Sequence, residues 1–227
     1  MTSPLRLVLF DVDGTLVDSQ GSIVSAMSAS FDALSLPAPE REATLSIVGL
    51  SLPQAIARLA PEQSSDQQAL LVEGYKKAYH AQRLSQGAAS SPLYPGAREV
   101  IETLHATPEI LLGVATGKSQ RGLDALLDAH DLAQFFVTRQ VADHHPSKPH
   151  PSMIETALSE TGIAPKNTVM IGDTSFDMEM AAAAGVAAVG VSWGYHEPSA
   201  LTSAADVIDS FEALPDVLNR IWEQEDE

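Results

Sequence analysis

The chain has 227 residues, with 13 basic and 30 acidic side chains that give a formal net charge of −17 at pH 7. A charge of this sign argues against nucleic acid or an anionic membrane surface as a partner. The chain has no cysteine, which excludes disulfides, thiolate metal sites and cysteine nucleophiles. The N-terminus does not read as a signal peptide and no apolar stretch reaches membrane-spanning length, so we expect a cytoplasmic protein.

The first predicted element is a short strand over residues 7–10, which ends at Asp11 and Asp13. Its four consecutive apolar residues are typical of a strand buried on both faces of a sheet. Two carboxylates this close repel each other unless a cation lies between them, and Mg²⁺ is the simplest candidate. Gly14 leaves the backbone free to turn and exposes amide groups to an anion. Taken alone, these residues would also suit a polar turn.

From residue 17 to residue 92 the strand signal disappears and the apolar residues take helical spacing. This spacing predicts helices over about 23–34, 52–59 and 65–83, and a short helix between the first two that ends at 47–49. Residues 86–92 are small and polar, as in a linker. We therefore predict an all-helical domain over 17–92, inserted into a core domain made of residues 1–16 and 93–227.

Beyond residue 93, strands and helices are expected to alternate. Strands are predicted over 110–115, 135–137, 168–171, 186–191 and 205–208, and helices around 100–104, 123–127, 151–161, 178–184 and 211–222. Such alternation implies right-handed crossovers and a mainly parallel sheet. The predicted fold class is α/β, a Rossmann-like parallel sheet core with an inserted helical cap.

Three of these strands end in polar groups: the first in Asp11 and Asp13, the second in Thr116, and the strand over 168–171 in Asp173. The carboxyl ends of parallel strands meet at one edge of the sheet, where open α/β sheets bind ligands. We therefore expect these groups to converge on a single site.

Each polar group also has an ordinary explanation. Thr116-Gly117 would suit a helix cap and turn, and Lys148 would suit an exposed loop. Asp173 and Asp177 would suit the start of a helix, where carboxylates favour the dipole. Their joint occurrence in this order is much harder to explain by chance.

Four motifs carry a family resemblance, namely DVDGTL at residues 11–16, TGK at 116–118, KPHP at 148–151 and GDTSFD at 172–177. With these motifs the chain resembles the haloacid dehalogenase superfamily, and within it the phosphoglycolate-phosphatase-like group with a helical C1-type cap. The resemblance implies a Mg²⁺-dependent phosphatase that acts on a small phosphorylated metabolite. It names phosphoglycolate as the leading substrate by family likeness alone, with sugar phosphates, pyrophosphate and nucleotide monophosphates left open.

The resemblance also implies residue roles. Asp11 would attack the phosphorus to form an aspartyl-phosphate, and Asp13 would protonate the leaving group and then activate water. Lys148 would offset the charge of Asp11 and the phosphoryl group. The implied phosphate-binding set is Gly14, Thr116, Gly117 and Lys148, with Thr116 and Lys148 also counted as catalytic. The implied metal set is Asp11, Asp13 through its backbone carbonyl, Asp173 as a direct ligand, and Asp177 behind the metal or behind Lys148.

Other activities stay open at this stage. A dehalogenase needs neither Asp13 nor a metal, so Asp13 counts against it, whereas a β-phosphoglucomutase-type mutase keeps both aspartates. A phosphonate hydrolase would need a cap lysine, for which Lys76 and Lys77 are candidates, although adjacent helix lysines usually face solvent. A non-catalytic binding module would be expected to have lost Asp11 or Asp13.

The cap gives less information. Residues 47–52 resemble a loop that faces the substrate in relatives, and Gly49 would permit close approach, but a plain helix–helix turn fits equally well. We expect the two domains to open and close on linkers near 16–20 and 88–94. The sequence does not indicate an oligomeric state.

Overall fold

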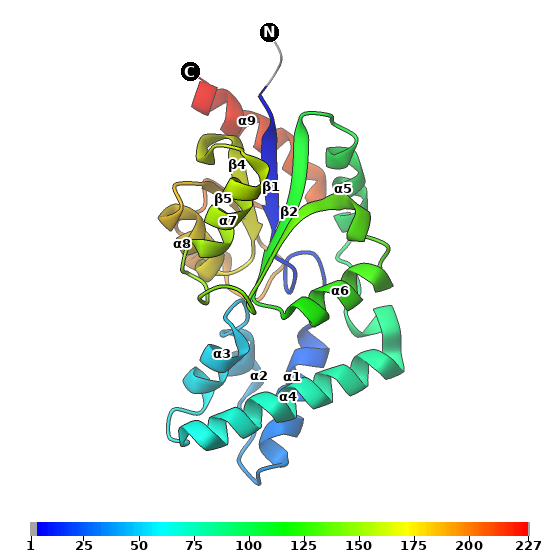
Figure 1. Ribbon diagram of the computed structural model, residues 1–227, viewed down its shortest axis with the longest axis vertical. Coiled ribbons are helices and arrows are strands. Elements are labelled where there is room, and N and C mark those ends of the chain that lie inside the picture. Colours follow the sequence, from blue (N-terminus) through cyan, green and yellow to red (C-terminus); the bar gives the residue numbers. More distant parts are fainter. Residues whose placement is uncertain (1–3, 227) are drawn as a thin grey trace.

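The computed structural model describes residues 4–226, which form a parallel six-stranded sheet with helices on both faces and a helical layer at one end (Figure 1). The strand order is β3-β2-β1-β4-β5-β6. The strands are β1 (Arg6–Phe10), β2 (Ile110–Thr116), β3 (Phe136–Val141), β4 (Thr168–Gly172), β5 (Ala187–Val191) and β6 (Asp206–Ile208). The predicted α/β class with a parallel sheet is confirmed.

The central strand β1 is buried on both faces, as its apolar run predicts. Leu7 and Leu9 pack on the helices of one face, and Val8 and Phe10 pack on those of the other, because successive side chains of a strand alternate. The first face carries α7 (Ser152–Thr161) and α8 (Ser175–Ala183), and the second carries α5 (Ala97–His105), α6 (Gln120–Ala129) and α9 (Leu214–Asp226). All four side chains are fully buried, which fixes the position of the residues that follow.

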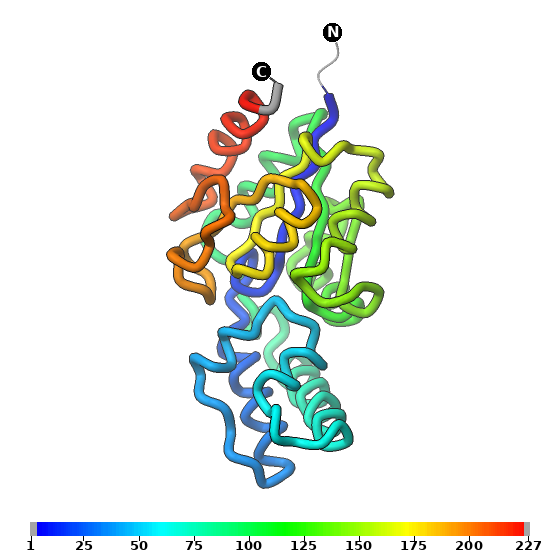
Figure 2. Tube along the Cα trace, turned by 90° about the vertical axis from the view of Figure 1, so that its left-hand side faces the viewer, coloured from blue at the N-terminus to red at the C-terminus, as the bar shows by residue number. Residues whose placement is uncertain are grey.

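The helical layer, called the cap below, consists of α1 (Gln20–Asp32), α2 (Arg41–Leu45), α3 (Leu52–Leu59) and α4 (Ser65–Gln86). Figures 1 and 2 show it beyond the carboxyl ends of β1 and β2, at the end of the molecule opposite both termini. Its apolar cluster includes Met27, Ile56 and Leu71, together with Phe176 from α8. The cap core is therefore partly closed by a residue of the sheet domain. Within residues 4–226, no helix is both long and apolar enough to cross a membrane.

Two chain connections join the cap to the sheet and run side by side. Asp18 donates its backbone N–H to the carbonyl of Pro92 at 2.8 Å, and Tyr94 donates to Leu16 at 2.9 Å. The two connections are thus hydrogen-bonded to each other. This arrangement would allow the cap to tilt as one rigid body. The division into residues 17–92 and the remainder stays a prediction.

The element boundaries differ from the predicted ones where polar residues interrupt or extend a pattern. Strand β3 runs to Val141 instead of 137 because Thr138 and Gln140 are buried and both contact the Glu160 carboxylate, at 2.5 and 2.8 Å. Helix α8 begins at Ser175, earlier than expected, because Thr174 and Asp177 form a capping box. Where buried polar residues are hydrogen-bonded to one another, the apolar pattern is interrupted and the sequence underpredicts the length of the strand.

Candidate active site

The carboxyl ends of β1, β2 and β3 open into one cavity of about 400 Å³ between the sheet and the cap, and Asp173 after β4 lies beside Asp11 at its floor. Its floor is lined by Asp11, Asp13, Thr116 and Gly117, and its walls by cap residues of α1, α3 and α4. The structure therefore brings together the polar strand ends that the sequence placed on one edge. We use "floor" below for the sheet edge and "roof" for the cap surface that faces it.

Three carboxylates meet at the floor. Asp11, Asp173 and Asp177 each place one oxygen so that the three oxygens lie within 4.8 Å of one another, and all three residues are buried. Both oxygens of Asp11 are buried, and neither accepts a hydrogen bond from a donor in residues 4–226. Burial, the main cause, raises the pKa of Asp11 to about 7; Asp177 and Asp13 add to this rise, and Lys148 opposes it.

Asp173 is held by two donors. Its Oδ1 accepts from the Thr15 hydroxyl at 2.9 Å and its Oδ2 from the Tyr195 N–H at 2.8 Å. Burial, followed by the charges of Asp11 and Asp177, raises the pKa of Asp173 well above its usual range.

Gly14 makes room for Asp173. Its φ is +86°, and a Cβ at this position would lie 2.2 Å from Asp173 Oδ2, so a larger residue would displace the carboxylate. The Gly14 N–H donates to the carbonyl of Val17 at 2.9 Å. This amide is thus engaged inside the turn and is not exposed to an anion, contrary to the expectation for Gly14. The glycine is needed for clearance.

Lys148 is buried between two of the carboxylates. Its Nζ donates to Asp177 Oδ1 at 2.6 Å and lies 3.1 Å from Asp11 Oδ1, at an angle that makes an ion pair without a hydrogen bond. Burial alone would lower the pKa of Lys148, but Asp11 and Asp177 raise it more, so the amine stays charged. The alternative of an exposed loop lysine is wrong, since Lys148 is only 1% exposed.

Asp177 serves two neighbours at once. Its Oδ1 accepts from Lys148, and its Oδ2 accepts from the Thr174 N–H at 3.1 Å and the Thr174 hydroxyl at 2.7 Å. Both of its oxygens are therefore occupied. The helix-start explanation holds for Asp177 together with the contact to Lys148.

The donor set at the floor fits Mg²⁺. One ammonium group faces three buried carboxylates, and the orphaned oxygens of Asp11 need a cation to be stable in their ionised form. Carboxylate oxygens are ligands that Mg²⁺ prefers. Asp11 and Asp173 are the carboxylates best suited to bind it directly, because Asp177 already accepts from other donors.

Asp13 is held by residues that the sequence analysis missed. Its Oδ1 accepts from Lys118 Nζ at 2.7 Å and from the hydroxyl of Ser19, and Lys118 also donates to the Tyr79 hydroxyl at 3.1 Å. Burial lowers the pKa of Lys118, but Asp13 and Tyr79 together raise it more, so the net shift is upward. The place of Lys118 directly behind a strand end could have revealed it. Ser19 and Tyr79 lie in the cap segment and had no comparable signal.

The segment 47–52 covers the floor and lines the cavity. Gly49 has a φ of +98°, and its carbonyl oxygen lies 2.7 Å from where a Cβ on Gly117 would stand. Ser51 donates its N–H to the Ser147 hydroxyl at 2.8 Å, which ties this loop to the sheet domain. The position favours the substrate-facing interpretation over a plain helix–helix turn. Lys76 also lines the cavity, but its side chain is 56% exposed and paired with Glu73, which gives no support to an imine-forming role.

Similarity to known proteins shows the family of the chain. A family model described as haloacid dehalogenase-like hydrolase matches residues 8–191. The chain belongs to this family. The resemblance read from the four motifs is confirmed, and with it the prediction of a hydrolase.

Known proteins resemble the chain over nearly its whole length. The probable phosphatase IndB of Dickeya dadantii is 37% identical over 210 residues, 90% of either chain. A phosphoglycolate phosphatase of Vibrio parahaemolyticus is 28% identical over 220 residues, 94% of this chain and 96% of that protein. The structure of a β-phosphoglucomutase from Clostridium difficile superposes with a TM-score of 0.83 at 18% identity, covering 97% of this chain and 98% of that one. At this identity, the last likeness shows the fold alone.

Proposed function

We propose that this family member is a Mg²⁺-dependent phosphatase that hydrolyses a small phosphomonoester through an aspartyl-phosphate. The observation that carries the proposal is the environment of the Asp11 carboxylate. Its two oxygens lie at a strand end, at the floor of the cavity and next to a buried ammonium group, and no donor in the described part of the chain hydrogen-bonds to them. A carboxylate that is fixed but not hydrogen-bonded is available for bonding to phosphorus and to a cation.

In the first step, a carboxylate oxygen of Asp11 forms a bond to phosphorus and the bond from phosphorus to the alcohol oxygen breaks. The leaving alkoxide takes its proton from Asp13. Lys148 offsets the negative charge on Asp11 and the phosphoryl group, while the hydroxyl of Thr116 and the N–H of Gly117 hold phosphoryl oxygens. Phosphoryl transfer depends mostly on such positioning, which the buried strand ends provide.

In the second step, Asp13 takes a proton from water, whose oxygen bonds to phosphorus as the bond to Asp11 breaks and phosphate leaves. Lys118 and Ser19 hold Asp13 through Oδ1. Its Oδ2 accepts no hydrogen bond from residues 4–226, and it is the oxygen that we assign to proton transfer. Asp13 is thereby restrained on one side and free on the other.

Mg²⁺ would be held by Asp11, Asp173 and the backbone carbonyl of Asp13, and when bound it would offset the negative charge of the carboxylates and the phosphoryl group. Asp177 keeps Lys148 in place. The geometry that supports this is the approach of three carboxylate oxygens within 4.8 Å.

The substrate class comes from the relatives. IndB is named a probable phosphatase and the relative from Vibrio a phosphoglycolate phosphatase, so we propose a small phosphorylated metabolite, with phosphoglycolate as the first compound to test.

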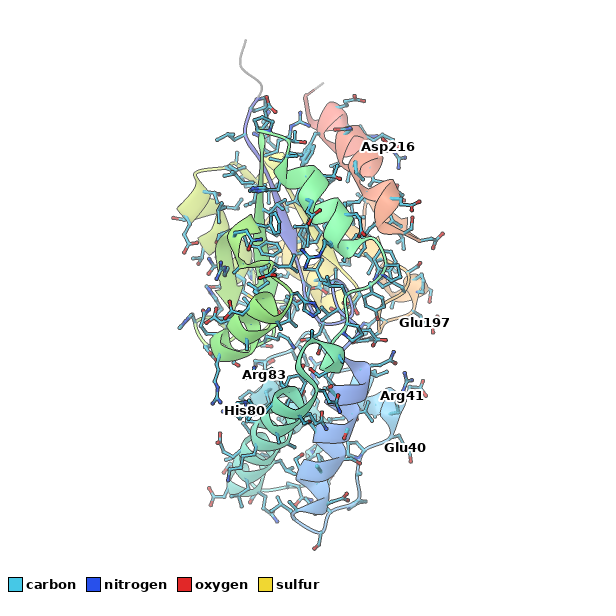
Figure 3. The ribbon with its side chains drawn as sticks, turned by 90° about the vertical axis from the view of Figure 1, so that its right-hand side faces the viewer. Glu40, Arg41, His80, Arg83, Glu197 and Asp216 are labelled. Atoms are coloured by element: carbon cyan, nitrogen blue, oxygen red, sulfur yellow. The ribbon has the colours of Figure 1, made fainter. Side chains whose placement is uncertain are left out.

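The test is phosphate release from a panel of phosphomonoesters, with Mg²⁺ and with chelator, by the unaltered protein, by Asp11→Asn and by Asp216→Asn. Asp216 is an exposed control on α9, far from the cap (Figure 3). We expect Mg²⁺-dependent release that Asp216→Asn retains and Asp11→Asn loses. Release that survives in Asp11→Asn would overturn the mechanism. If nothing is released but Asp11 becomes phosphorylated by sugar bisphosphates, the protein is a mutase.

A further inference from the structure

A group of three basic side chains lines the cavity away from the floor: His80 and Arg83 of α4 and Arg121 of α6. We call it the distal cationic cluster. Arg121 Nη2 lies 2.7 Å from His80 Nε2, and Arg83 Nη2 lies 3.1 Å from His80 Nδ1. Figure 3 shows His80 and Arg83 on the side of α4 that faces α6.

The contacts within the cluster leave it one acceptor short. A guanidinium group only donates hydrogen bonds, and a neutral imidazole accepts at just one of its two nitrogens. Both His80 nitrogens face a guanidinium group, so in either tautomer one contact pairs a donor with a donor. Burial and then the charges of Arg121 and Arg83 lower the pKa of His80, which favours the neutral ring over the imidazolium. The cluster lacks an acceptor.

No carboxylate among the described residues supplies that acceptor. Within residues 4–226, neither Arg83 nor Arg121 forms a salt bridge, although the chain has 30 acidic and 13 basic side chains. Lys118, another cation of the cavity wall, is paired with Asp13. Asp143 also lines the cavity, but its Oδ2 accepts from the Gln120 N–H at 2.8 Å. In such an acidic protein, two unpaired arginines on one cavity wall mark a place for an external anion.

The position of the cluster indicates what this anion belongs to. It lies in the same cavity as the phosphate-binding floor, and it joins the cap to the sheet domain, since Arg83 Nη1 lies 3.4 Å from the carbonyl of Arg121. We infer that the substrate carries a second anionic group, a carboxylate or a second phosphate, which Arg83, Arg121 and His80 bind while the floor holds the phosphoryl group. The inference rests on the proposed phosphatase function. An anion held by both α4 and α6 would also favour a closed cap.

The test compares substrates that differ in the distal charge. Phosphoglycolate, 3-(phosphooxy)propionate and 4-(phosphooxy)butyrate are each paired with the corresponding neutral amide. Ethane- to butanediol bisphosphates, each paired with the corresponding diol monophosphate, form the second arm. We expect the unaltered protein to prefer a bis-anionic compound over its neutral counterpart by at least about tenfold in kcat/KM, as for a hydrogen bond to a charged group. The series with the larger preference identifies the distal anion as a carboxylate or a phosphate. The chain length with the highest kcat/KM indicates the distance between the phosphoryl site and the distal cationic cluster.

The double variant Arg83→Gln/Arg121→Gln should reduce this preference to about twofold or less, with kcat/KM for the neutral compounds little changed. The matched control is Arg41→Gln, which removes a cap arginine on the opposite side of the molecule (Figure 3). No preference at any chain length, or an equal loss for charged and neutral compounds in the double variant, would overturn the inference.

Failure of the proposed function gives a different result, namely no hydrolysis of the neutral phosphomonoesters either. In that case, the same pairs of compounds are compared as ligands by the shift in thermal midpoint of the Mg²⁺-loaded protein. A larger shift for the bis-anionic member that the double variant loses supports the cluster, and equal shifts contradict it.

Discussion

The floor and the roof of the cavity are built in different ways. On the floor, Asp11, Lys148 and Asp173 are at most 1% exposed and follow strands or loops that the sheet holds rigidly. On the roof, Tyr79, His80 and Arg83 are partly exposed side chains along one helix, and their polar contacts to the sheet domain run through Lys118 and Arg121. Chemistry that needs charges fixed in place is assigned to the first region.

This difference indicates that the floor determines the type of reaction and the roof determines which substrates are preferred. Neutralising or moving a floor residue leaves a buried charge without its partner, so the penalty falls on every substrate alike. A roof residue contacts only the part of a substrate that projects from the phosphoryl group. We therefore expect floor substitutions to reduce turnover in general and roof substitutions to change the ranking of substrates.

The largest expected effect tests the floor. Lys148→Met should lower kcat by about 10²–10³-fold for every phosphomonoester, because the charge on Asp11 and the phosphoryl group loses its cation. Removal of one partner of a buried pair should also cost about 3–5 kcal/mol of unfolding free energy, measured with urea. Lys77→Met, which removes an exposed lysine of α4, is the matched control. A loss confined to some substrates would contradict the division between floor and roof.

Lys118 lies where floor and roof meet, and its substitution shows to which it belongs. Because it holds Asp13 and contacts Tyr79, Lys118→Met should lower kcat by about 10–100-fold and change the pH profile of kcat. Tyr79→Phe leaves the Asp13 contact intact and should cost about 2–10-fold, the effect of one hydrogen bond. Equal effects of the two substitutions would mean that Lys118 serves cap closure and not Asp13.

The floor was also the part that the sequence could predict. Strand ends on one edge of a parallel sheet must converge, so Asp11, Thr116 and Asp173 could be brought together without coordinates. The clearance role of Gly14 could not, since it depends on the path of Asp173 from a strand far along the chain. For the cap, the sequence predicted the helices but not their contacts, because helical periodicity indicates which face of a helix is buried and not what packs against it. Tyr79 and the distal cationic cluster depend on how α4 lies against α6.

A smaller effect should come from Gly117, where the backbone of the roof lies close to the floor. A Cβ at this position would lie 2.7 and 2.8 Å from the carbonyl oxygens of Gly49 and Leu50, and these backbone atoms cannot rotate away. Gly117→Ala should hold the cap slightly open and lower kcat/KM by about tenfold. Gly21→Ala in α1, where a Cβ meets nothing within 4 Å, should leave kcat/KM unchanged. Normal activity of Gly117→Ala would show that the roof need not close this tightly.

The smallest effect, a shift of a few degrees, tests whether the floor needs a cation. Folding raises the pKa of Asp11 from 3.8 to about 7, so between these values the folded protein binds more protons than the unfolded chain. Without metal, the unfolding free energy should therefore fall as the pH rises from about 4 to 7, and the stabilisation should be absent above pH 7. Mg²⁺ binds the ionised carboxylates, so it should raise Tm by about 2–4 °C or more at pH 8 and by less at pH 5. In Asp11→Asn, position 11 has no proton to lose, and this pH dependence should weaken. A Mg²⁺ shift that is the same at pH 5 and pH 8 would mean that the cation binds elsewhere, and that Lys148 alone neutralises the floor.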